Sequence, residues 1–223
     1  MSPGRARADS GAPRTVLLTG FGPFGAEAFN PSERVVRALD GQRLAGGLQV
    51  RGRVLPVAFD AARAALDEDF ASHGMPALAL GLGLAASRRE LSVERVALNL
   101  ADAPIPDAAG EQPVDLPLAA SGPPARFATW PAKAVAAALR AAGHPCGLSL
   151  SAGSHVCNAV LYALLERLEP LGVPAGFLHL PPIAVWPLER QVDAVRLALV
   201  TAAAAPIEGT AGAAAPGPGG ALD

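Results

Sequence analysis

The stretch Gly147–Leu168, GLSLSAGSHVCNAVLYALLERL, changes its hydrophobic period once along its length. The first part, GLSLS at Gly147–Ser151, is short and strand-like, and a turn that contains Gly153 follows it. From Val156 onward, apolar residues recur every three or four positions, as on the buried face of a helix. The segment therefore predicts a strand, a tight turn and a helix, which is the building unit of an α/β protein.

The same alternation continues over most of the chain. We expect strands at Thr15–Thr19, Gln49–Pro56, Ala77–Gly83, Leu91–Leu100, Gly147–Ser151 and Gly176–Leu180, and helices at Ser32–Leu39, Phe59–Ser72, Pro131–Ala142, Val156–Leu168 and Leu188–Ala203. This order predicts an α/β fold with a mostly parallel sheet and helices on both faces, in which functional side chains gather at the carboxyl ends of strands. The segment Ala101–Ala128, rich in Pro and Gly, is expected to be one long irregular connection with a functional role.

Length and composition set the domain organisation. A chain of 223 residues and 22.5 kDa supports one α/β domain, since two would both be undersized. We expect this folded domain to span residues 14–207. Residues 1–13 and 208–223 are rich in Gly, Ala and Pro, and we expect both to be disordered tails.

Charge and cysteine content argue against several classes of partner. A formal net charge of -2 and a pI near 6.1 give no basic face for nucleic acid or an anionic membrane. Apolar runs are interrupted well before the length of a membrane span, and no apolar segment of a signal peptide follows Arg5 and Arg7. We therefore expect a cytoplasmic protein with reduced thiols. The four histidines are scattered, so we expect no metal site.

A glycine-rich motif follows the first expected strand. GFGPFG, with Gly20, Gly22 and Gly25, matches the G-x-G-x-x-G pattern of dinucleotide-binding proteins. That pattern must open a helix of several turns, whereas Asn30-Pro31 interrupts the chain soon afterwards. A dinucleotide-binding domain is therefore the less favoured alternative, and we expect no cofactor.

Three residues from different segments have the chemistry of a thiol hydrolase. Cys157 lies in the first turn of its helix, where Ser154 is the expected N-cap and free N–H groups favour a thiolate and an oxyanion. Glu94 lies in register with the apolar residues of its strand, and His179 ends the last strand. Each has an ordinary alternative alone: Cys157 and His179 as core residues, and Glu94 as an exposed edge residue. Together they form a nucleophile, an acid that orients the base, and a general base.

Their neighbours carry weaker signals. Cys146 and His144 are expected to be loop residues in GHPCG, and His155 is expected to point away from Cys157. Phe21 and Phe24, on the glycine-rich loop, are either apolar walls of a site or core residues.

Several motifs then match one family in the same order and at similar spacing. These motifs are TGFGPFG followed by NPSER, then GRVLPV, GLAASR, LSVERVALN, SAGSHVCN and GFLHLP. From about Val16 to His179, the chain resembles the pyroglutamyl peptidase I family, also called pyrrolidone-carboxylate peptidases, which are cysteine peptidases. The resemblance implies a single three-layer α/β/α domain, so the domain of residues 14–207 is expected to be a peptidase domain.

The resemblance also implies an activity and a set of site residues. The family removes N-terminal pyroglutamyl (5-oxoprolyl) residues from peptides through a thiol acyl-enzyme, and its members form homodimers or homotetramers. Its catalytic residues correspond to Glu94, Cys157 and His179, and its substrate-binding residues to Phe21, Phe24 and Arg88.

One stretch departs from the family pattern. The family usually has DARIPDN where this chain has DAPIPDA, so that Pro104 replaces an arginine near the active site and Ala108 replaces an asparagine. The alternative to a peptidase is therefore a family member that mainly binds pyroglutamyl or lactam ligands, with weakened or altered activity.

Overall fold

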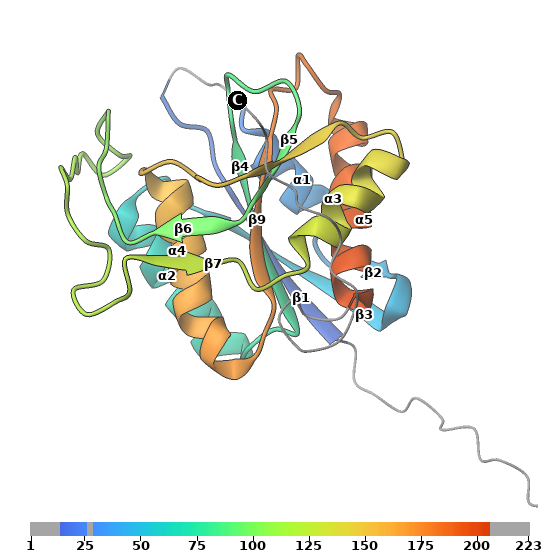
Figure 1. The fold of residues 1–223 in the computed structure, drawn as a ribbon, viewed down its shortest axis with the longest axis horizontal. Helices are drawn as coiled ribbons and strands as arrows, with labels where there is room; N and C mark the ends of the chain where they lie inside the picture. The colour runs from blue at the N-terminus through green and yellow to red at the C-terminus, as the bar shows by residue number, and fades with distance from the viewer. Residues whose placement is uncertain (1–13, 26–28, 206–223) are drawn as a thin grey trace, which may run out of the picture.

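The computed structural model describes residues 14–25 and 29–205. The two expected tails, residues 1–13 and 208–223, lie outside the described residues. Within the described part, the elements alternate between strands and helices in the order that the sequence predicts (Figure 1).

A seven-stranded sheet forms the centre of the molecule, with the strand order β2-β3-β1-β4-β9-β5-β8. The strands β1, β3, β4 and β9 are parallel to one another, and β5 and β8 are parallel to each other but antiparallel to β9. The short β2 is antiparallel to β3. The bounds of these strands are Arg14–Phe21 (β1), Arg43–Leu44 (β2), Leu48–Leu55 (β3), Leu78–Leu84 (β4), Leu91–Glu94 (β5), Cys146–Ser149 (β8) and Ala175–Leu180 (β9). The sheet is thus mostly parallel, as predicted.

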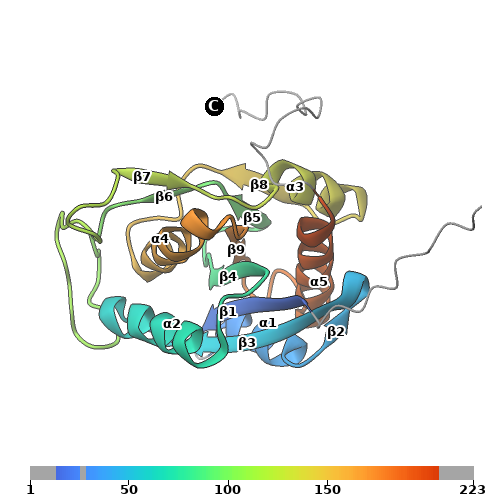
Figure 2. The same ribbon diagram turned by 90° about the horizontal axis from the view of Figure 1, so that it is seen from below.

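Helices cover both faces of the sheet, which makes three layers (Figures 1 and 2). On one face lie α2 and α4, and on the other lie α1, α3 and α5. The bounds are Pro31–Leu39 (α1), Phe59–His73 (α2), Ala132–Ala141 (α3), Val156–Leu168 (α4) and Leu188–Ala204 (α5), with 3-10 turns at Ala45–Gly47 (η1) and Glu169–Leu171 (η2). Each interface between helices and sheet is a separate hydrophobic core. The predicted three-layer α/β/α fold is therefore confirmed.

The prediction of one strand over Leu91–Leu100 is wrong. The segment leaves the central sheet after Glu94 and continues as β6 (Val96–Leu98), which pairs with β7 (Ala125–Phe127) in a separate two-stranded sheet. The backbone of this second part finds its partners on α4: the buried Asn158 side chain accepts a hydrogen bond from the Leu98 N–H and donates to the Leu98 and Leu100 carbonyls. Because a side chain supplies these hydrogen bonds, the segment needs no neighbour from the central sheet.

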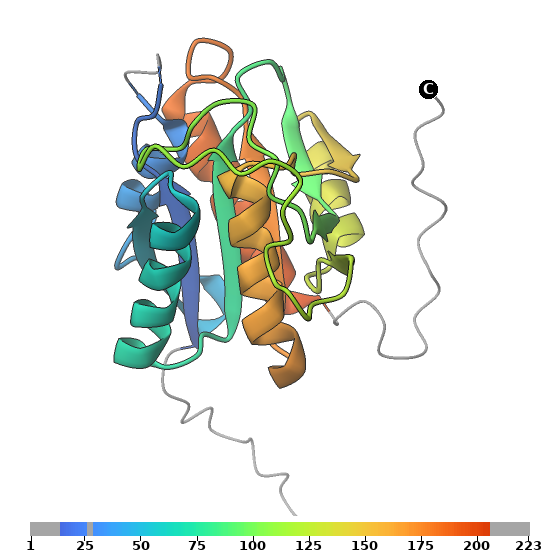
Figure 3. The same ribbon diagram turned by 90° about the vertical axis from the view of Figure 1, so that its left-hand side faces the viewer.

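The long connection between β6 and α3 contains more regular structure than the irregular connection that we predicted. It contains β7 and a bridge between Ala101 and Leu116. In Figure 3, where α2 and α4 lie side by side in front of the sheet, this connection runs across the start of α4. Its backbone is hydrogen-bonded there, since the Asp102 N–H donates to the Ser154 carbonyl.

Cys146 is likewise not a loop residue. It is the first residue of β8, is buried, and its thiol lies 3.4 Å from the Ala136 carbonyl of α3. A small apolar residue fits this packed position, and burial raises the pKa of the thiol. Cys146 thus belongs to the core on the face opposite Cys157.

Candidate active site

A pocket of about 300 Å³ lies at the carboxyl ends of the parallel strands β1, β4 and β9. Loops that leave these strands, together with the start of α4, form its walls. The lining residues are Phe21, Phe24, Asn30, Val57, Leu84, Ala86, Ala152, His155, Val156, Cys157 and His179. The site is therefore at the edge of the sheet where a parallel α/β fold collects functional side chains.

Cys157 is the second residue of α4 and is half-buried in this pocket. The N–H groups of the first helical turn have no partner within the helix, so they are available near the sulfur. The N-cap is His155, whose backbone is extended and whose side chain makes no capping hydrogen bond. The expectation that Ser154 is the N-cap is wrong, because its hydroxyl donates instead to the Asp102 carbonyl of the long connection.

His179 and Glu94 lie on the same face of the sheet because of their strand register. Glu94 is directly opposite Phe177 in the antiparallel pair of β5 and β9, and Phe177 is two residues before His179 on the same face. The His179 Nδ1 atom is 2.8 Å from the Glu94 Oε1 atom, and the carboxylate is fully buried. Since a carboxylate can only accept, Nδ1 carries the proton, which leaves Nε2 for Cys157.

The protonation of His179 reflects both partners. Burial of the imidazole alone would lower its pKa from 6.5. Hydrogen bonds to Cys157 and Glu94, together with electrostatic interactions with the same two residues, outweigh burial and raise the pKa to about 9. The structure therefore favours a protonated imidazole between a sulfur and a carboxylate at neutral pH, and it brings the three residues selected from the sequence together.

Arg88 lies beside this group and not in the pocket lining. Its guanidinium donates to Glu94 Oε1 over 2.7 Å and to the Ser151 carbonyl over 3.4 Å. The same carboxylate oxygen thus receives Arg88 on one side and His179 on the other. This placement differs from the substrate-binding role that the resemblance implies, and it suits a residue that holds Glu94 in place.

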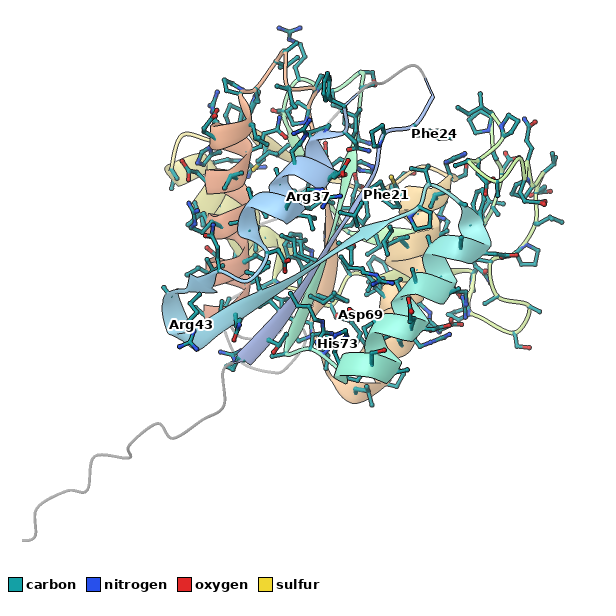
Figure 4. All side chains as sticks on the ribbon, turned by 180° about the vertical axis from the view of Figure 1, so that it is seen from behind. Phe21, Phe24, Arg37, Arg43, Asp69 and His73 are labelled. Atoms are coloured by element: carbon teal, nitrogen blue, oxygen red, sulfur yellow. The ribbon has the colours of Figure 1, made fainter. Side chains whose placement is uncertain are left out.

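The aromatic residues of the glycine-rich loop do face the pocket. Phe21 is buried at the end of β1 and Phe24 is half-buried, and Figure 4 shows both at the end of the sheet opposite His73 of α2. His155 was expected to point away from the site, but its ring also lines the pocket. It lies 5.7 Å from the Phe24 ring and 5.3 Å from the Phe59 ring, because the N-cap position turns it outward from the helix axis toward both.

The glycine-rich loop is held by α1 and does not open it. The Asn30 side chain caps α1 by accepting from the Ser32 N–H and also donates to the Gly22 carbonyl. The Ser32 hydroxyl accepts the Phe21 N–H, so this donor is already used within the protein. A Cβ at Gly20 would lie 2.7 Å from the Ser32 carbonyl oxygen, which explains that glycine by close packing of α1. The geometry does not support the dinucleotide alternative.

Sequence reasoning passed over two polar residues of this region. Asn30 was read only as a break in the chain, although Asn before Pro is a good N-cap signal. Asn158 is fully buried next to Cys157, in a helix whose other buried residues are apolar or aromatic. A buried amide requires partners. Its position within the apolar stripe was therefore a usable signal.

Comparison with known proteins now decides the family. A family model described as pyroglutamyl peptidase matches residues 14–205. The chain belongs to the pyroglutamyl peptidase family. This match covers every described element of the fold and confirms the family that the sequence motifs indicated.

Individual members of the pyroglutamyl peptidase family are similar over most of their length. The pyrrolidone-carboxylate peptidase of Chromobacterium violaceum is 50% identical over 170 residues, which are 75% of this chain and 78% of that protein. That of Cupriavidus pinatubonensis is 44% identical over 211 residues, or 87% of this chain and 95% of that protein. The crystal structure of pyroglutamyl peptidase I from Bacillus amyloliquefaciens has a TM-score of 0.82 and 33% identity, and covers 87% of this chain and 97% of that one.

Two further findings concern membrane-spanning helices and metal-binding clusters in the described residues. None of the helices in residues 14–25 and 29–205 is long and apolar enough to cross a membrane. In the same residues, no three His, Cys, Asp or Glu side chains gather in a way that could hold a metal ion.

Proposed function

We propose that this protein is a cysteine exopeptidase that removes N-terminal pyroglutamyl residues from peptides. The observation that carries the proposal is the hydrogen-bonded series of Cys157, His179 and Glu94 at the wall of an apolar pocket. Membership of the pyroglutamyl peptidase family supports the same activity.

The pocket suits the ring of the substrate. A pyroglutamyl residue is a flat, neutral lactam without the charged amine of other N-termini, so it needs apolar walls and a few polar contacts. Phe21 and Phe24 supply aromatic surface, and Val57, Leu84 and Val156 supply aliphatic surface. A charged N-terminal amine would lose its hydration in such a pocket without a compensating partner, which favours the lactam.

In the first half of the proposed reaction, the peptide is cleaved. His179 takes the proton of the Cys157 thiol before bond making, which leaves the imidazole protonated, and the sulfur then attacks the carbonyl carbon of the pyroglutamyl residue. Backbone N–H groups in the first turn of α4 hold the oxygen that becomes negative. The C–N bond then breaks as His179 returns the proton to the leaving amine, and a thioester remains on Cys157.

In the second half, water hydrolyses the thioester. The neutral His179 accepts a proton from the water, and the resulting hydroxide attacks the same carbonyl carbon. Collapse of the intermediate breaks the C–S bond and releases pyroglutamate with the proton returned to the sulfur. Glu94 holds His179 by its Nδ1 atom throughout, so that Nε2 stays directed at the reacting atoms.

A reporter assay with a cysteine control tests the proposal. The wild type is expected to hydrolyse a pyroglutamyl amide reporter, and iodoacetamide is expected to abolish that hydrolysis. Cys157→Ala should be inactive, whereas Cys146→Ala, which removes the cysteine in the opposite core, should stay active and remain sensitive to iodoacetamide. Cleavage by Cys157→Ala, or resistance of the Cys146→Ala variant to iodoacetamide, would contradict the assignment of the nucleophile.

The alternative of a member that mainly binds ligands is not supported. Pro104, on which that alternative rested, is exposed and is not among the residues that line the pocket. The Ala108 side chain is exposed as well, and its N–H donates to the Val57 carbonyl beside the pocket. Nothing in the arrangement of Cys157, His179 and Glu94 depends on the residues that this chain has changed.

Location and assembly belong to the same proposal. We propose a cytoplasmic protein that forms a homodimer or homotetramer, as the family resemblance implies. Light scattering on the purified full chain measures the mass directly, and a mass of one chain at micromolar concentration would contradict the proposed assembly.

A further inference from the structure

The strand β4 presents two glycines toward α4, in the sequence LALGLGL. A Cβ placed on Gly81 would lie 2.4 Å from the ring of Phe177. A Cβ placed on Gly83 would lie 2.8 Å from the Sγ atom of Cys157 and 3.0 Å from the ring of Phe177. Carbon and sulfur atoms in ordinary contact are about 3.5–4.0 Å apart, so neither position has room for a side chain.

The conformation of the backbone does not explain the glycine at position 83. Gly83 is not among the glycines with positive φ in the described chain, and any residue could adopt its strand conformation. Glycine also weakens a strand interior, since it has no side chain to pack. The glycine is therefore explained by what occupies the space above it, namely the sulfur of Cys157 together with the ring of Phe177.

Strand register places this contact inside the catalytic group. Gly83 and His179 are paired residues in the parallel ladder of β4 and β9, so both face α4. The sulfur lies where a Cβ atom of residue 83 would point and is hydrogen-bonded to the imidazole on the neighbouring strand. The missing side chain thus lets α4 approach the sheet closely enough for this hydrogen bond.

We propose that Gly83 is a positioning residue for the nucleophile: the absence of its side chain sets the depth at which the Cys157 sulfur rests beside His179. This inference rests on the proposed function and extends it to a residue that takes no part in bond making. In Gly83→Ala, the sulfur must move away from β4 by on the order of 1 Å to reach an ordinary contact distance. A displacement of that size in a reacting atom lowers a rate by about 100-fold.

The first test is the kinetics of Gly83→Ala. Its kcat is expected to fall by about 100-fold, with KM changed by less than about threefold, because the walls made by Phe21 and Phe24 stay in place. The matched control is Gly176→Ala, whose Cβ would lie 2.3 Å from Trp130 on the opposite face of the sheet. This control is expected to lose stability but to keep kcat per folded molecule. A folded Gly83→Ala variant with the wild-type kcat overturns the proposal.

The second test does not depend on peptide cleavage. The rate of iodoacetamide alkylation of Cys157 at pH 7 reports the pairing of the sulfur with His179, and it should fall in Gly83→Ala but not in Gly176→Ala. If the wild type fails to cleave the reporter, the proposed function fails while this comparison still stands. An unchanged alkylation rate in Gly83→Ala contradicts the positioning role alone.

The third test remains informative if Gly83→Ala folds poorly. In a Cys157→Ala background the sulfur is gone, so adding Gly83→Ala should increase the unfolding equilibrium constant far less than it does in the wild type. The contact with Phe177 persists in both backgrounds and cancels in the comparison. Equal effects in the two backgrounds would show that the sulfur does not occupy the space that Gly83 leaves, and would overturn the proposal.

Discussion

Replacing Glu94 by Gln should change the protonation of His179 while preserving the shape of the site. The Glu94 Oε1 atom accepts from both His179 and Arg88, whereas the Oε2 atom is buried and has no hydrogen-bond partner in the part of the chain that the structure describes. A glutamine can therefore keep its oxygen toward both donors and turn its NH2 group to the Oε2 position. The substitution then removes chiefly the negative charge, at the added cost of a buried NH2 group without an acceptor, about 1–3 kcal/mol.

The size of the effect follows from the pKa of His179. Its rise from 6.5 to about 9 corresponds to about 3 kcal/mol in favour of the charged imidazole. This free energy is the combined effect of Glu94 and Cys157 after the opposing effect of burial has been subtracted. An opposite charge in contact shifts a pKa by about 1–3 units, so Glu94→Gln should lower the pKa of His179 by that amount. The fraction of neutral imidazole at pH 7 would then rise, and the neutral form would dominate if the pKa falls by more than about two units. We therefore expect kcat to fall together with the rate of alkylation of Cys157.

Titration followed by NMR measures this shift directly. The His179 ring signal is assigned by its loss in His179→Ala and compared between Cys157→Ala and Cys157→Ala/Glu94→Gln, so that the thiol does not titrate in either protein. The midpoint should be lower by at least about one pH unit in the second protein. Midpoints that agree within experimental error would refute the argument that the Glu94 charge holds the proton on His179.

The same substitution has a signature in stability. Because the pKa of His179 is higher in the folded protein than the unfolded value of 6.5, its contribution is complete below pH 6.5 and is lost as the pH rises to about 9. The wild type should therefore lose unfolding free energy across this window. Glu94→Gln should lose less across it, so the difference between the two proteins in urea unfolding should be larger at pH 6 than at pH 9.5.

Three other substitutions test separate parts of the structure. Arg88→Gln should lower kcat by about 10- to 100-fold and leave KM nearly unchanged, because Arg88 contacts Glu94 and does not line the pocket. Steady-state kinetics measure both constants. A raised KM with an unchanged kcat would instead support a role of Arg88 in substrate binding. Asn158→Ala should lower the free energy of unfolding by about 2–4 kcal/mol, measured by urea unfolding, because it leaves one N–H and two carbonyls of the β6 segment without their partner. A loss below about 1 kcal/mol would contradict the view that Asn158 supports this segment. Burial alone would raise the pKa of the Asp107 carboxyl. Hydrogen bonds from backbone N–H groups, chiefly the one from Phe59 at the start of α2, outweigh burial and lower this pKa below 3.8. Asp107→Asn should therefore cost about 1–2 kcal/mol at pH 7, and the difference from wild type should shrink as the pH falls below 3.8; a difference independent of pH would contradict the charge argument.

The helices were predicted closely from the sequence, and α4 with the same bounds. The apolar stripe from Val156 to Leu168 recurs with the helical period, and such a local pattern depends only on neighbours along the chain. The alternation of strands and helices likewise indicated the α/β fold, because each parallel crossover needs a helix between two strands. The chemistry proposed for Cys157, His179 and Glu94 was also indicated by residue type and by their places at a helix start and in strands.

The break after Glu94 could not be predicted from the sequence. The run LSVERVALNL alternates as a single strand would, and it divides because β5 joins the central sheet while Asn158 of α4 supplies hydrogen bonds to the continuation. The contact of Arg88 with Glu94 and the place of His155 in the pocket wall were not predicted, for a similar reason. Each side chain contacts a partner on another part of the fold: Arg88 contacts Glu94 across a turn, and His155 contacts the ring of Phe24.

Sequence alone therefore determined the helices, the longer strands of the central sheet, their order and the residue types proposed to carry the reaction, because periodicity and turn chemistry are local. Tertiary structure alone decided how those residues meet. The register between β5 and β9 aligns Glu94 with His179, and the side-chain-free surface at Gly83 lets the Cys157 sulfur reach the same face. Such contacts depend on pairing between strands and on packing between layers, and these join residues that no local pattern relates.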